Sequence, residues 1–362
     1  MKAYLVETND LRNNIAYLQS CAGDAPFWAV LKGSAYGLGL IPMARVCAEC
    51  GVTRFCVTET DDVKALRDAG FSSAQILMLR PTCSDAEIRT LLGLGAIFTV
   101  SGQDDAAVLN GIAQQMGVVA EAHLKIDTGM GRYGYLPGEI DKMLPVYQYM
   151  DGIAVSGIYT HLHSAFGKKK TAEAQFAAFD RVLSALTAAG VESGTPHVLN
   201  SCGLLRFPER VMGGVRVGSA LLGRTPVACK ELKRIGVCEA QIEELRWLPK
   251  GHTCGYGAGW KAKRPTRIAV LSVGWYHGFG MERGTDIFRL RDRLRGVVSA
   301  LKNFVAPRRF TVSVNGKKCR VLGHIGMLHT VADVTKVPCA LGDRALLEIS
   351  PTFLRGMDVI FK

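Results

Sequence analysis

Long apolar runs are missing from this chain of 362 residues. No stretch reaches the roughly 18 consecutive apolar residues that indicate a membrane-spanning helix, so no integral membrane segment is predicted. The start of the chain also lacks a secretory signal, because acidic and amide residues interrupt the apolar stretch that such a signal needs, in MKAYLVETNDLRNNI. The composition, 48% hydrophobic and 21% charged, is typical of a soluble globular protein. We expect a cytoplasmic location.

The eleven cysteines lack the pattern of a disulfide framework. Their number is odd, they are scattered, and most lie within apolar runs such as RFCVTET. We therefore expect reduced, buried thiols. Cys47 and Cys50 form a CAEC pair, but no second pair and no nearby histidine completes the four ligands of a structural zinc site. No metal site is predicted.

Basic residues exceed acidic ones, 44 to 32, which gives a net charge of +12. The basic clusters are spread along the chain, at residues 168–170, 230–234, 261–267 and 289–295. None is interleaved with aromatic residues that could stack on bases, so a nucleic-acid partner is not predicted. A basic surface that attracts anionic small molecules is the preferred interpretation. An anionic membrane surface stays open as an alternative.

Short apolar strands alternate with amphipathic helices from residue 26 to about residue 225. Many of the helical stretches end in glycine, as helix C-termini do. The predicted strands lie at 27–32, 55–59, 75–79, 96–100, 120–126, 154–161, 197–200 and 214–218. This alternation predicts a closed (β/α)8 TIM-type barrel. A doubly wound open sheet is the alternative, although no GxGxxG motif follows the first strand.

The pattern changes after about residue 232. Runs such as RIAVLSVGW and RFTVSVNGKKCRVLGHIG are rich in strand formers and are separated by Gly, Asn-Gly and Pro turns. We therefore predict two domains, a barrel at 1–232 and a mostly β domain at 233–362. The segment 280–307 is basic and partly helical in pattern, and it fits neither domain clearly.

Polar residues gather where the predicted barrel strands end. In barrels of this type the chemistry takes place at the C-terminal ends of the strands. The residues at these positions are Lys32, Lys125, Arg132, His161, Asn200, Ser201 and Arg216. Taken singly, His161 is equally well a core histidine and Arg216 half of an ion pair, so only their joint placement indicates a site.

Lys32 has the most informative surroundings of this group. It follows the apolar run in WAVLKGSAYG, and partial desolvation there lowers the pKa of a lysine, which suits it to covalent catalysis. The small residues after it leave room for a bulky cofactor. A lysine that extends to solvent from a strand end fits the same spacing.

Several segments, in the same order over nearly the whole chain, resemble the alanine racemase family. They are WAVLKGSAYGLG, KIDTGMGRYG, THLHSA, LNSCGLLR, GGVRVGSALLG, CGYGAGW, VGWYHG and GHIGMLHTVADVT. The first two and the GYG segment are specific, and the others gain weight from their order. The resemblance implies a (β/α)8 barrel, a C-terminal β domain, pyridoxal 5'-phosphate as cofactor and a head-to-tail homodimer.

The resemblance also implies the catalytic groups. Lys32 would bind the cofactor covalently and act as the base for the D-enantiomer. Tyr256, from the β domain of the partner, would act on the opposite face for the L-enantiomer. Arg216 would face the pyridine nitrogen, with His161 between Arg216 and the tyrosine. In many members of the family the lysine that matches Lys125 is carbamylated and orients an arginine.

The remaining roles implied by the resemblance concern binding. Tyr36, Ser201 and Gly218–Ser219 would hold the phosphate, as hydroxyls and backbone amides commonly do. Arg132 would contact the phenolic oxygen of the cofactor and the carboxylate of a small amino-acid substrate. The backbone amide of Met327 would reach the same carboxylate.

The sequence departs from the family at three places. Leu328 stands where an aspartate is usual, and Trp275 and His277 stand for tyrosine and aspartate. A tyrosine usual near Pro351 is missing from the tail. The tail is more similar to the racemase domains of membrane-bound serine racemases. The resemblance as a whole makes alanine the expected substrate, and these departures keep serine or a broad set of amino acids as the alternative.

Three other functions compete with this interpretation. A non-catalytic pyridoxal-phosphate carrier has a similar barrel but lacks the β domain and the GYG tyrosine. A barrel-type decarboxylase would need a Cys-Asp pair and a glycine-rich phosphate loop, which we do not find. A racemase-like paralogue with lost activity or a changed substrate stays open because of the three departures.

Overall fold

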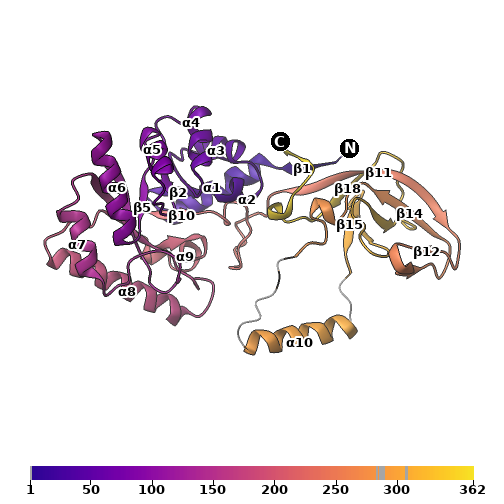
Figure 1. Ribbon diagram of the computed structural model, residues 1–362. Coiled ribbons are helices and arrows are strands. Elements are labelled where there is room, and N and C mark those ends of the chain that lie inside the picture. The colour runs from indigo at the N-terminus through magenta and orange to yellow at the C-terminus, as the bar shows by residue number, and fades with distance from the viewer. Residues whose placement is uncertain (1, 283, 285–289, 306–308) are drawn as a thin grey trace. The chain divides into compact units, whose positions relative to one another are not determined.

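The computed structural model describes residues 2–282, 284, 290–305 and 309–362 (Figure 1). The chain divides into two compact units, one formed by Thr8–Ile235 and the other by Met1–Glu7 with Gly236–Lys362. No helix among the described residues is long and apolar enough to cross a membrane.

The first unit contains the parallel strands that the sequence predicted. They are β2 (Phe27–Val30), β3 (Arg54–Val57), β4 (Gln75–Met78), β5 (Phe98–Val100), β6 (Ala120–Ile126), β7 (Ile153–Thr160), β8 (Thr195–His197), β9 (Leu199–Asn200) and β10 (Val215–Val217). They pair in parallel in two groups, β4-β3-β2-β10-β9 and β5-β6-β7-β8.

Two connections close these groups into a ring. A parallel bridge between Leu77 and Ile97 joins β4 to β5. Only Val198 separates β8 from β9, so the two form one strand that pairs with β7 through its first part and with β10 through its second. The eight-stranded barrel is therefore confirmed, and the open sheet is excluded.

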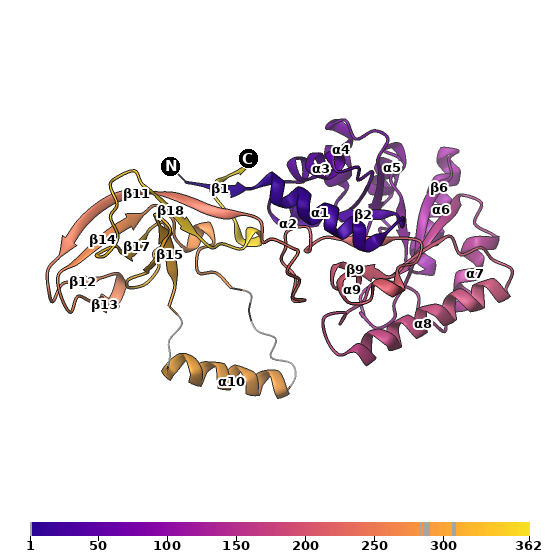
Figure 2. The same cartoon turned by 180° about the vertical axis from the view of Figure 1, so that it is seen from behind.

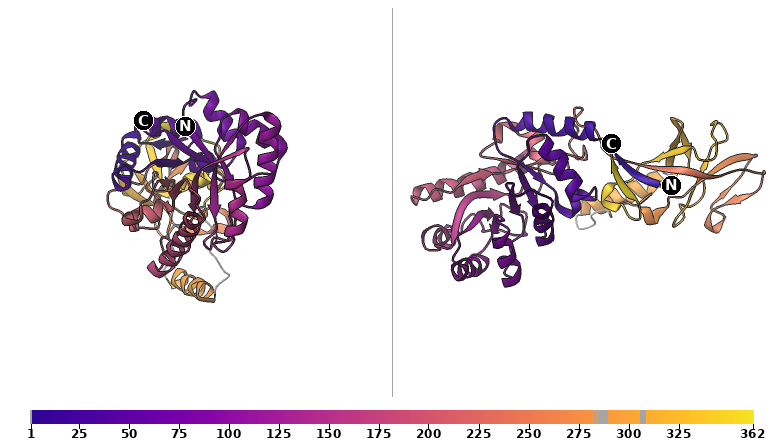
Figure 3. Two further views of the ribbon diagram at one scale, coloured as in Figure 1. Left: turned by 90° about the vertical axis from the view of Figure 1, so that its left-hand side faces the viewer. Right: turned by 90° about the horizontal axis from the view of Figure 1, so that it is seen from above.

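Helices surround these strands, as the left view of Figure 3 shows. They are α1 (Thr8–Ala22), α3 (Leu40–Glu49), α4 (Thr60–Asp68), α5 (Asp85–Gly93), α6 (Gln103–Met116), α7 (Ile140–Gln148), α8 (Lys169–Ala188) and the short α2 (Lys32–Tyr36) and α9 (Ser201–Arg206). Each long helix buries one stripe, as α6 does with Leu109, Ile112 and Ala113. The side chain of Asn14 in α1 donates to the carbonyls of Leu221 and Lys233, which ties this helix to the segment after β10.

The second unit is built on a mostly antiparallel sheet (Figure 2). Its strands are β1 (Lys2–Val6), β11 (Val237–Leu248), β14 (Thr266–Leu271), β15 (Thr311–Val314), β16 (Lys317–Arg320), β17 (Thr330–Asp333), β18 (Arg344–Leu347) and β19 (Asp358–Phe361), with β12 (Thr253–Cys254) and β13 (Trp260–Lys261) as a separate pair. The sheet order is β16-β15-β18-β11-β1-β19, and β14 joins β11 to β17. Asn315 and Gly316 link β15 to β16 with φ of 48° and 75°, the signature of a tight hairpin turn.

The first strand of the chain belongs to this second unit, although the predicted boundary placed it with the barrel. β1 pairs antiparallel with β11 and parallel with β19. Its KAYLV segment is almost wholly buried, and its partners lie more than two hundred residues away, a pairing that local pattern does not reveal. The division falls between Ile235 and Gly236, three residues after the predicted one.

The described part of the segment 280–307 includes the helix α10 (Leu290–Val305). Residues 283, 285–289 and 306–307 of this segment lie outside the described part of the chain. No residue of α10 is buried.

Candidate active site

A left-handed turn follows β2 and begins at Lys32. The backbone of Gly33, Ser34, Ala35 and Tyr36 has φ of 60°, 52°, 51° and 59°. In a residue with a side chain this conformation costs roughly 1–2 kcal/mol, so three such residues in succession make a strained turn. Strain of this kind concentrates at functional sites. The turn sets Lys32 at the end of β2 and brings Tyr36 to the turn after β10.

Hydroxyl and backbone amide groups converge around Tyr36. The backbone amide of Ser219 donates to the Tyr36 hydroxyl, and burial raises the pKa of Tyr36 to about 12. The Ser201 hydroxyl accepts from the amides of Gly218 at 3.0 Å and Ala220 at 3.3 Å. A Cβ atom on Gly218 would lie only 2.1 Å from the Tyr36 hydroxyl oxygen, so glycine is required there. This cradle of amides and hydroxyls fits a phosphate group.

Cationic side chains surround the end of β6. Burial, and then the charges of Arg216 and Arg132, lower the pKa of Lys125 to about 7. Burial, and then Arg132, also lower the pKa of Lys32. The pKa of His161 falls well below its ordinary value, first because of burial and then because of Arg216. Positive groups that lower one another's pKa in this way favour the binding of an anionic ligand.

The loop after β6 is held by one carboxylate. Asp127 accepts from the backbone amides of Gly129 at 2.8 Å, Met130 at 2.7 Å, Gly131 at 2.8 Å and Arg132 at 3.1 Å. Four amide donors on one carboxylate fix the backbone that carries Arg132. The sequence interpretation missed this role of Asp127, although an aspartate before two glycines in DTGMG was its signal.

Arg216 in β10 is anchored by a chain of histidines that the sequence interpretation also missed. Its Nη1 donates to Nδ1 and to the carbonyl of His197, each at 2.7 Å, and its Nη2 donates to the carbonyl of Thr160 at 2.5 Å. Because arginine only donates, His197 carries its proton on Nε2. That nitrogen lies 2.9 Å from Nδ1 of His123, so His123 also carries its proton on Nε2.

Tyr159 forms an aromatic layer beside this chain. Its ring stacks on that of His197, with centroids 4.9 Å apart and planes at 18°. The Arg216 guanidinium lies 4.7 Å from the ring centroid and the Lys125 amine 5.0 Å from it. The Tyr159 hydroxyl lies 2.8 Å from Oγ1 of Thr99. The ring of Tyr159 thus lies against both the guanidinium of Arg216 and the amine of Lys125.

His161 lies close to the predicted group but is not the residue that anchors Arg216. It follows β7 directly, and the charges of Arg216, Lys125, Lys32 and Arg132 all lower its pKa. The hydrogen bond from Arg216 to a histidine goes to His197 instead. In the barrel unit, Lys32, Lys125 and His161 lie at or next to the ends of β2, β6 and β7, Arg132 lies in the loop after β6, and Arg216 lies within β10 next to His197.

The second unit holds the other predicted residues. Tyr256 lies in the short helix η2 (Tyr256–Ala258), after Gly255, and is 79% exposed. A hollow of about 560 Å³ is lined by Tyr256, Met327 and Leu328, among others. The structure thus brings the predicted tyrosine, the predicted carboxylate-binding amide and one departure from the family into one concave surface.

The departures at Trp275 and His277 lie directly behind this hollow. They form the short helix η3 (Trp275–His277), whose Trp275 amide donates to the Gly326 carbonyl at 3.0 Å. The amide of Tyr276 donates to the carbonyl of Met327, also at 3.0 Å. Nδ1 of buried His277 accepts from the amide of Gly274 at 3.1 Å. His277 therefore stabilises the turn that supports Met327. Pro351, the third departure, is buried at the start of η4 (Pro351–Phe353).

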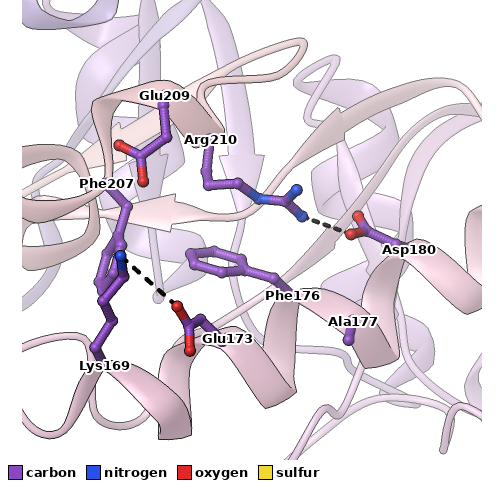
Figure 4. A pocket seen from close by; sticks show the side chains of 8 residues that line it. All are labelled: Lys169, Glu173, Phe176, Ala177, Asp180, Phe207, Glu209 and Arg210. Atoms are coloured by element: carbon purple, nitrogen blue, oxygen red, sulfur yellow. Dashed lines mark hydrogen bonds and ion pairs between the residues drawn. The ribbon is translucent and has the colours of Figure 1, made fainter.

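A different pocket lies on the outer helix α8 (Figure 4). Arg210 donates to Asp180 at 2.6 Å and its guanidinium lies 4.8 Å from the Phe176 ring centroid. Lys169 lies 3.7 Å from Glu173. Both cations are paired inside the pocket, and none of the predicted site residues lines it.

The match to family models covers both units. The alanine racemase N-terminal domain matches residues 6–226 and the alanine racemase C-terminal domain matches residues 237–351. The chain is 32% identical to the alanine racemase of Methylacidiphilum infernorum over 88% of this chain and 76% of that protein. It is 30% identical to the alanine racemase of Symbiobacterium thermophilum over 97% of this chain and 90% of that protein.

Solved structures show the same fold. The alanine racemase of Clostridium difficile 630 aligns with a TM-score of 0.86 and 21% identity over all of this chain and 95% of its own. The alanine racemase of Bartonella henselae, solved with covalently bound pyridoxal phosphate, aligns with a TM-score of 0.83 and 22% identity over all of this chain and 99% of its own. With both domains matched in order along the chain, this protein belongs to the alanine racemase family.

Proposed function

We propose that this protein is a pyridoxal-phosphate-dependent amino-acid racemase that interconverts L- and D-alanine. The observation that carries the proposal is the joint placement, in one barrel, of Lys32 at a strand end and of the cradle formed by Tyr36, Ser201, Gly218 and Ser219. A lysine with a lowered pKa and a phosphate-sized cradle are the two attachments that this cofactor needs. The relatives named alanine racemase support alanine as the substrate.

The residues of the chain fit the cofactor at three points. Lys32 would bind it covalently, and the cradle around Tyr36 would hold its phosphate. Arg216 would face its ring nitrogen, and because arginine only donates, a nitrogen beside it has to accept a hydrogen bond rather than carry a proton. When bound, pyridoxal phosphate supplies an electron-withdrawing ring that acidifies the Cα–H bond of an attached amino acid.

Two bases would act on opposite faces of the substrate. Lys32 would remove or return the proton on one face, and its lowered pKa increases the fraction of neutral amine. Tyr256 would do the same on the other face, and His161, which lies near enough to Arg216 for that charge to lower its pKa in addition to burial, would lie between the two. Arg132 and the amide of Met327 would bind the substrate carboxylate. Racemisation then needs no rotation of the substrate.

The proposal includes a head-to-tail homodimer. Tyr256 is 79% exposed at the edge of the hollow that Met327 lines, and a general base has to be shielded from bulk water to act at a defined face. The barrel of a partner subunit would provide that cover. The β domain, expected at 233–362 and observed as a unit from Gly236 onward, would then contribute Tyr256 to the partner.

Lys125 has the properties of a carbamylated lysine. A pKa of about 7 leaves much of the amine neutral and able to react with carbon dioxide. The carbamate would be an anion next to Arg132 and would relieve the repulsion among the cations. Protein labelled with ¹³C-bicarbonate should show a carbamate resonance that Lys125→Arg lacks. An unchanged spectrum in the variant would place the carbamate elsewhere.

Incubation of the purified protein with individual L-amino acids, followed by chiral separation, tests the proposed function. We expect D-alanine from L-alanine and the reverse reaction from D-alanine. Faster conversion of serine, or of many amino acids, would replace alanine by the alternative substrates, and Leu328 beside Tyr256 is the residue to exchange for aspartate in that case. A folded protein that is yellow from bound cofactor but converts none of the amino acids would support the non-catalytic alternatives. The cytoplasmic location expected from the reduced cysteines stays a prediction.

A further inference from the structure

Helix α10 (Leu290–Val305) presents an apolar surface that no other described part of the protein buries. All of its residues are accessible, and its large apolar side chains are strongly exposed, from 50% for Val298 to 88% for Phe304. A helix with this exposure needs a partner, because it would otherwise keep a large apolar area in water.

The apolar and charged residues of α10 lie on different sides of the helix. With 3.6 residues per turn, the apolar side chains fall within one broad arc made of Leu290, Leu294, Val297, Val298, Leu301, Phe304 and Val305. Arg291, Arg295 and Lys302 form one margin of this arc, and Arg293 lies at the other margin. The helix has four basic residues and one acidic residue. Asp292 lies on the polar side, 3.5 Å from Arg295.

A shallow groove runs along the first of these margins. It measures about 450 Å³, and it is lined by Arg291, Arg295 and Lys302 together with Leu294 and Val298. Cations beside an apolar floor match a phosphate group at the end of a hydrocarbon chain. Long basic side chains at the margin can keep their charge at the polar boundary while their stems lie on apolar surface.

We propose that α10 binds the surface of a membrane that contains anionic phospholipids, with its axis in the plane of the interface. A helix of 16 residues is too short and too charged to span a bilayer. A broad apolar arc with basic margins is the pattern of helices that lie at an interface. The excess of basic residues over the chain, 44 against 32, adds to the attraction.

The charge pattern opposes a second copy of α10 as the partner. Pairing two copies through their apolar arcs would bring basic margins against basic margins in either orientation, since both margins carry cations. Like charges across an interface are unfavourable. A negative lipid surface complements both margins at once.

Co-sedimentation of the full-length protein with lipid vesicles tests the proposal. We expect binding to vesicles with a third of phosphatidylglycerol in phosphatidylcholine, weaker binding at high salt, and little binding to phosphatidylcholine alone. Each cation near the surface contributes roughly a factor of five, so the triple variant Arg291→Glu, Arg295→Glu, Lys302→Glu should bind at least about 100-fold more weakly. Equal binding to neutral vesicles would overturn the electrostatic part of the proposal.

A matched triple variant controls for net charge. Lys168→Glu, Lys169→Glu and Lys170→Glu make the same change in charge on exposed residues far along the chain, and this variant should keep most of the binding. If both triple variants lose binding equally, the attraction belongs to the whole surface and the proposal is wrong. Circular dichroism melting curves should be alike for the two variants and the parent protein.

The apolar face is tested separately. Leu301→Gln with Phe304→Gln leaves the charge unchanged and should weaken binding at least about tenfold, since each buried apolar side chain contributes about that factor. Phe304→Trp should add fluorescence that brominated lipids quench. Failure of the quenching, or a smaller particle on gel filtration of the double Gln variant without lipid, would point to a protein partner and overturn the proposal. These measurements do not depend on racemase activity.

Discussion

In the barrel, Lys125 and Arg216 are each 3% exposed, whereas Tyr256 in the β unit is 79% exposed. The buried pair is surrounded by Tyr159, His197 and carbonyl oxygens, so its geometry is set before any ligand binds. The tyrosine has no such enclosure. The barrel groups are therefore held in place by the fold itself, whereas under the proposed function the surroundings of Tyr256 would be completed by a partner subunit.

The largest loss of activity should come from a change in the barrel, at Lys32. Replacing Lys32 by alanine removes both the attachment of the cofactor and one base, so activity and the yellow colour should be lost. Absorbance and borohydride reduction followed by peptide mapping check this, and exposed Lys64→Ala is the control. A reduced label on any lysine other than Lys32 would contradict the assignment.

The β side is tested by Tyr256→Phe. Removing a general base typically costs about 10²–10⁴-fold in rate, so racemisation should nearly stop. Exchange of the α-hydrogen of D-alanine with deuterated solvent should continue, because Lys32 still acts on its face. Proton NMR measures both processes. Full activity would point to another base or to a single-base mechanism.

Mixing the two variants tests whether the barrel of one subunit works with the Tyr256 of the other. A heterodimer of Lys32→Ala and Tyr256→Phe subunits would contain one site with both defects and one with neither. Activity should therefore return on mixing if the tyrosine acts in the partner. No recovery after demonstrated subunit exchange would mean that each subunit uses its own tyrosine, or none.

A smaller loss of activity is expected from His197→Asn, because this change removes the imidazole ring that accepts a hydrogen bond from Arg216. A hydrogen bond to a charged group contributes about 1.5–3 kcal/mol, so the rate should fall roughly 10–100-fold while the protein still binds its cofactor. The exposed His252→Asn in the β unit should change nothing. Equal activity of the two variants would show that Arg216 is positioned without the histidine chain.

The last effect is absent at neutral pH and concerns acid stability, which should differ between the units. Burial lowers the pKa of His123 to about 3 and that of His161 and His197 well below the ordinary value. The unfolded chain binds protons from about pH 6.5 downward, so the barrel should lose stability as the pH falls below that value, by about 1.4 kcal/mol per pH unit for each histidine. Hydrogen exchange with mass spectrometry, corrected for intrinsic rates, should show the barrel opening before the β unit. Replacing His123 by Gln should reduce the slope.

The barrel was predictable because its signals are local. Strand β6 was predicted at the bounds that it has, and the glycines that end helices marked the alternation. The residues at strand ends followed from the chain direction, since parallel strands present the same end to one rim. Lys32, Lys125 and Arg216 needed no more than this.

The missed features depend on contacts between distant segments. His123 and His197 lie inside strands, where a histidine in an apolar run looks like core, and only the barrel brings them within 2.9 Å. Asp127 was given no role from the sequence, and only the folded loop brings four amide donors to its carboxylate. Residues 2–6 were assigned to the barrel domain with the rest of 1–232, because nothing in KAYLV indicates that β11 and β19 are the partners of β1.

Periodicity, turn residues and motif order were enough to predict the barrel strands, many of the helices between them, the family and several candidate site residues. They work because hydrophobic spacing and backbone preference are properties of neighbouring residues. Which ring anchors Arg216, how far the pKa of Lys125 falls and which unit receives the first strand were decided by the tertiary structure. Those properties arise from burial and from charges brought together across the fold, and desolvation exists only once the chain has enclosed a group.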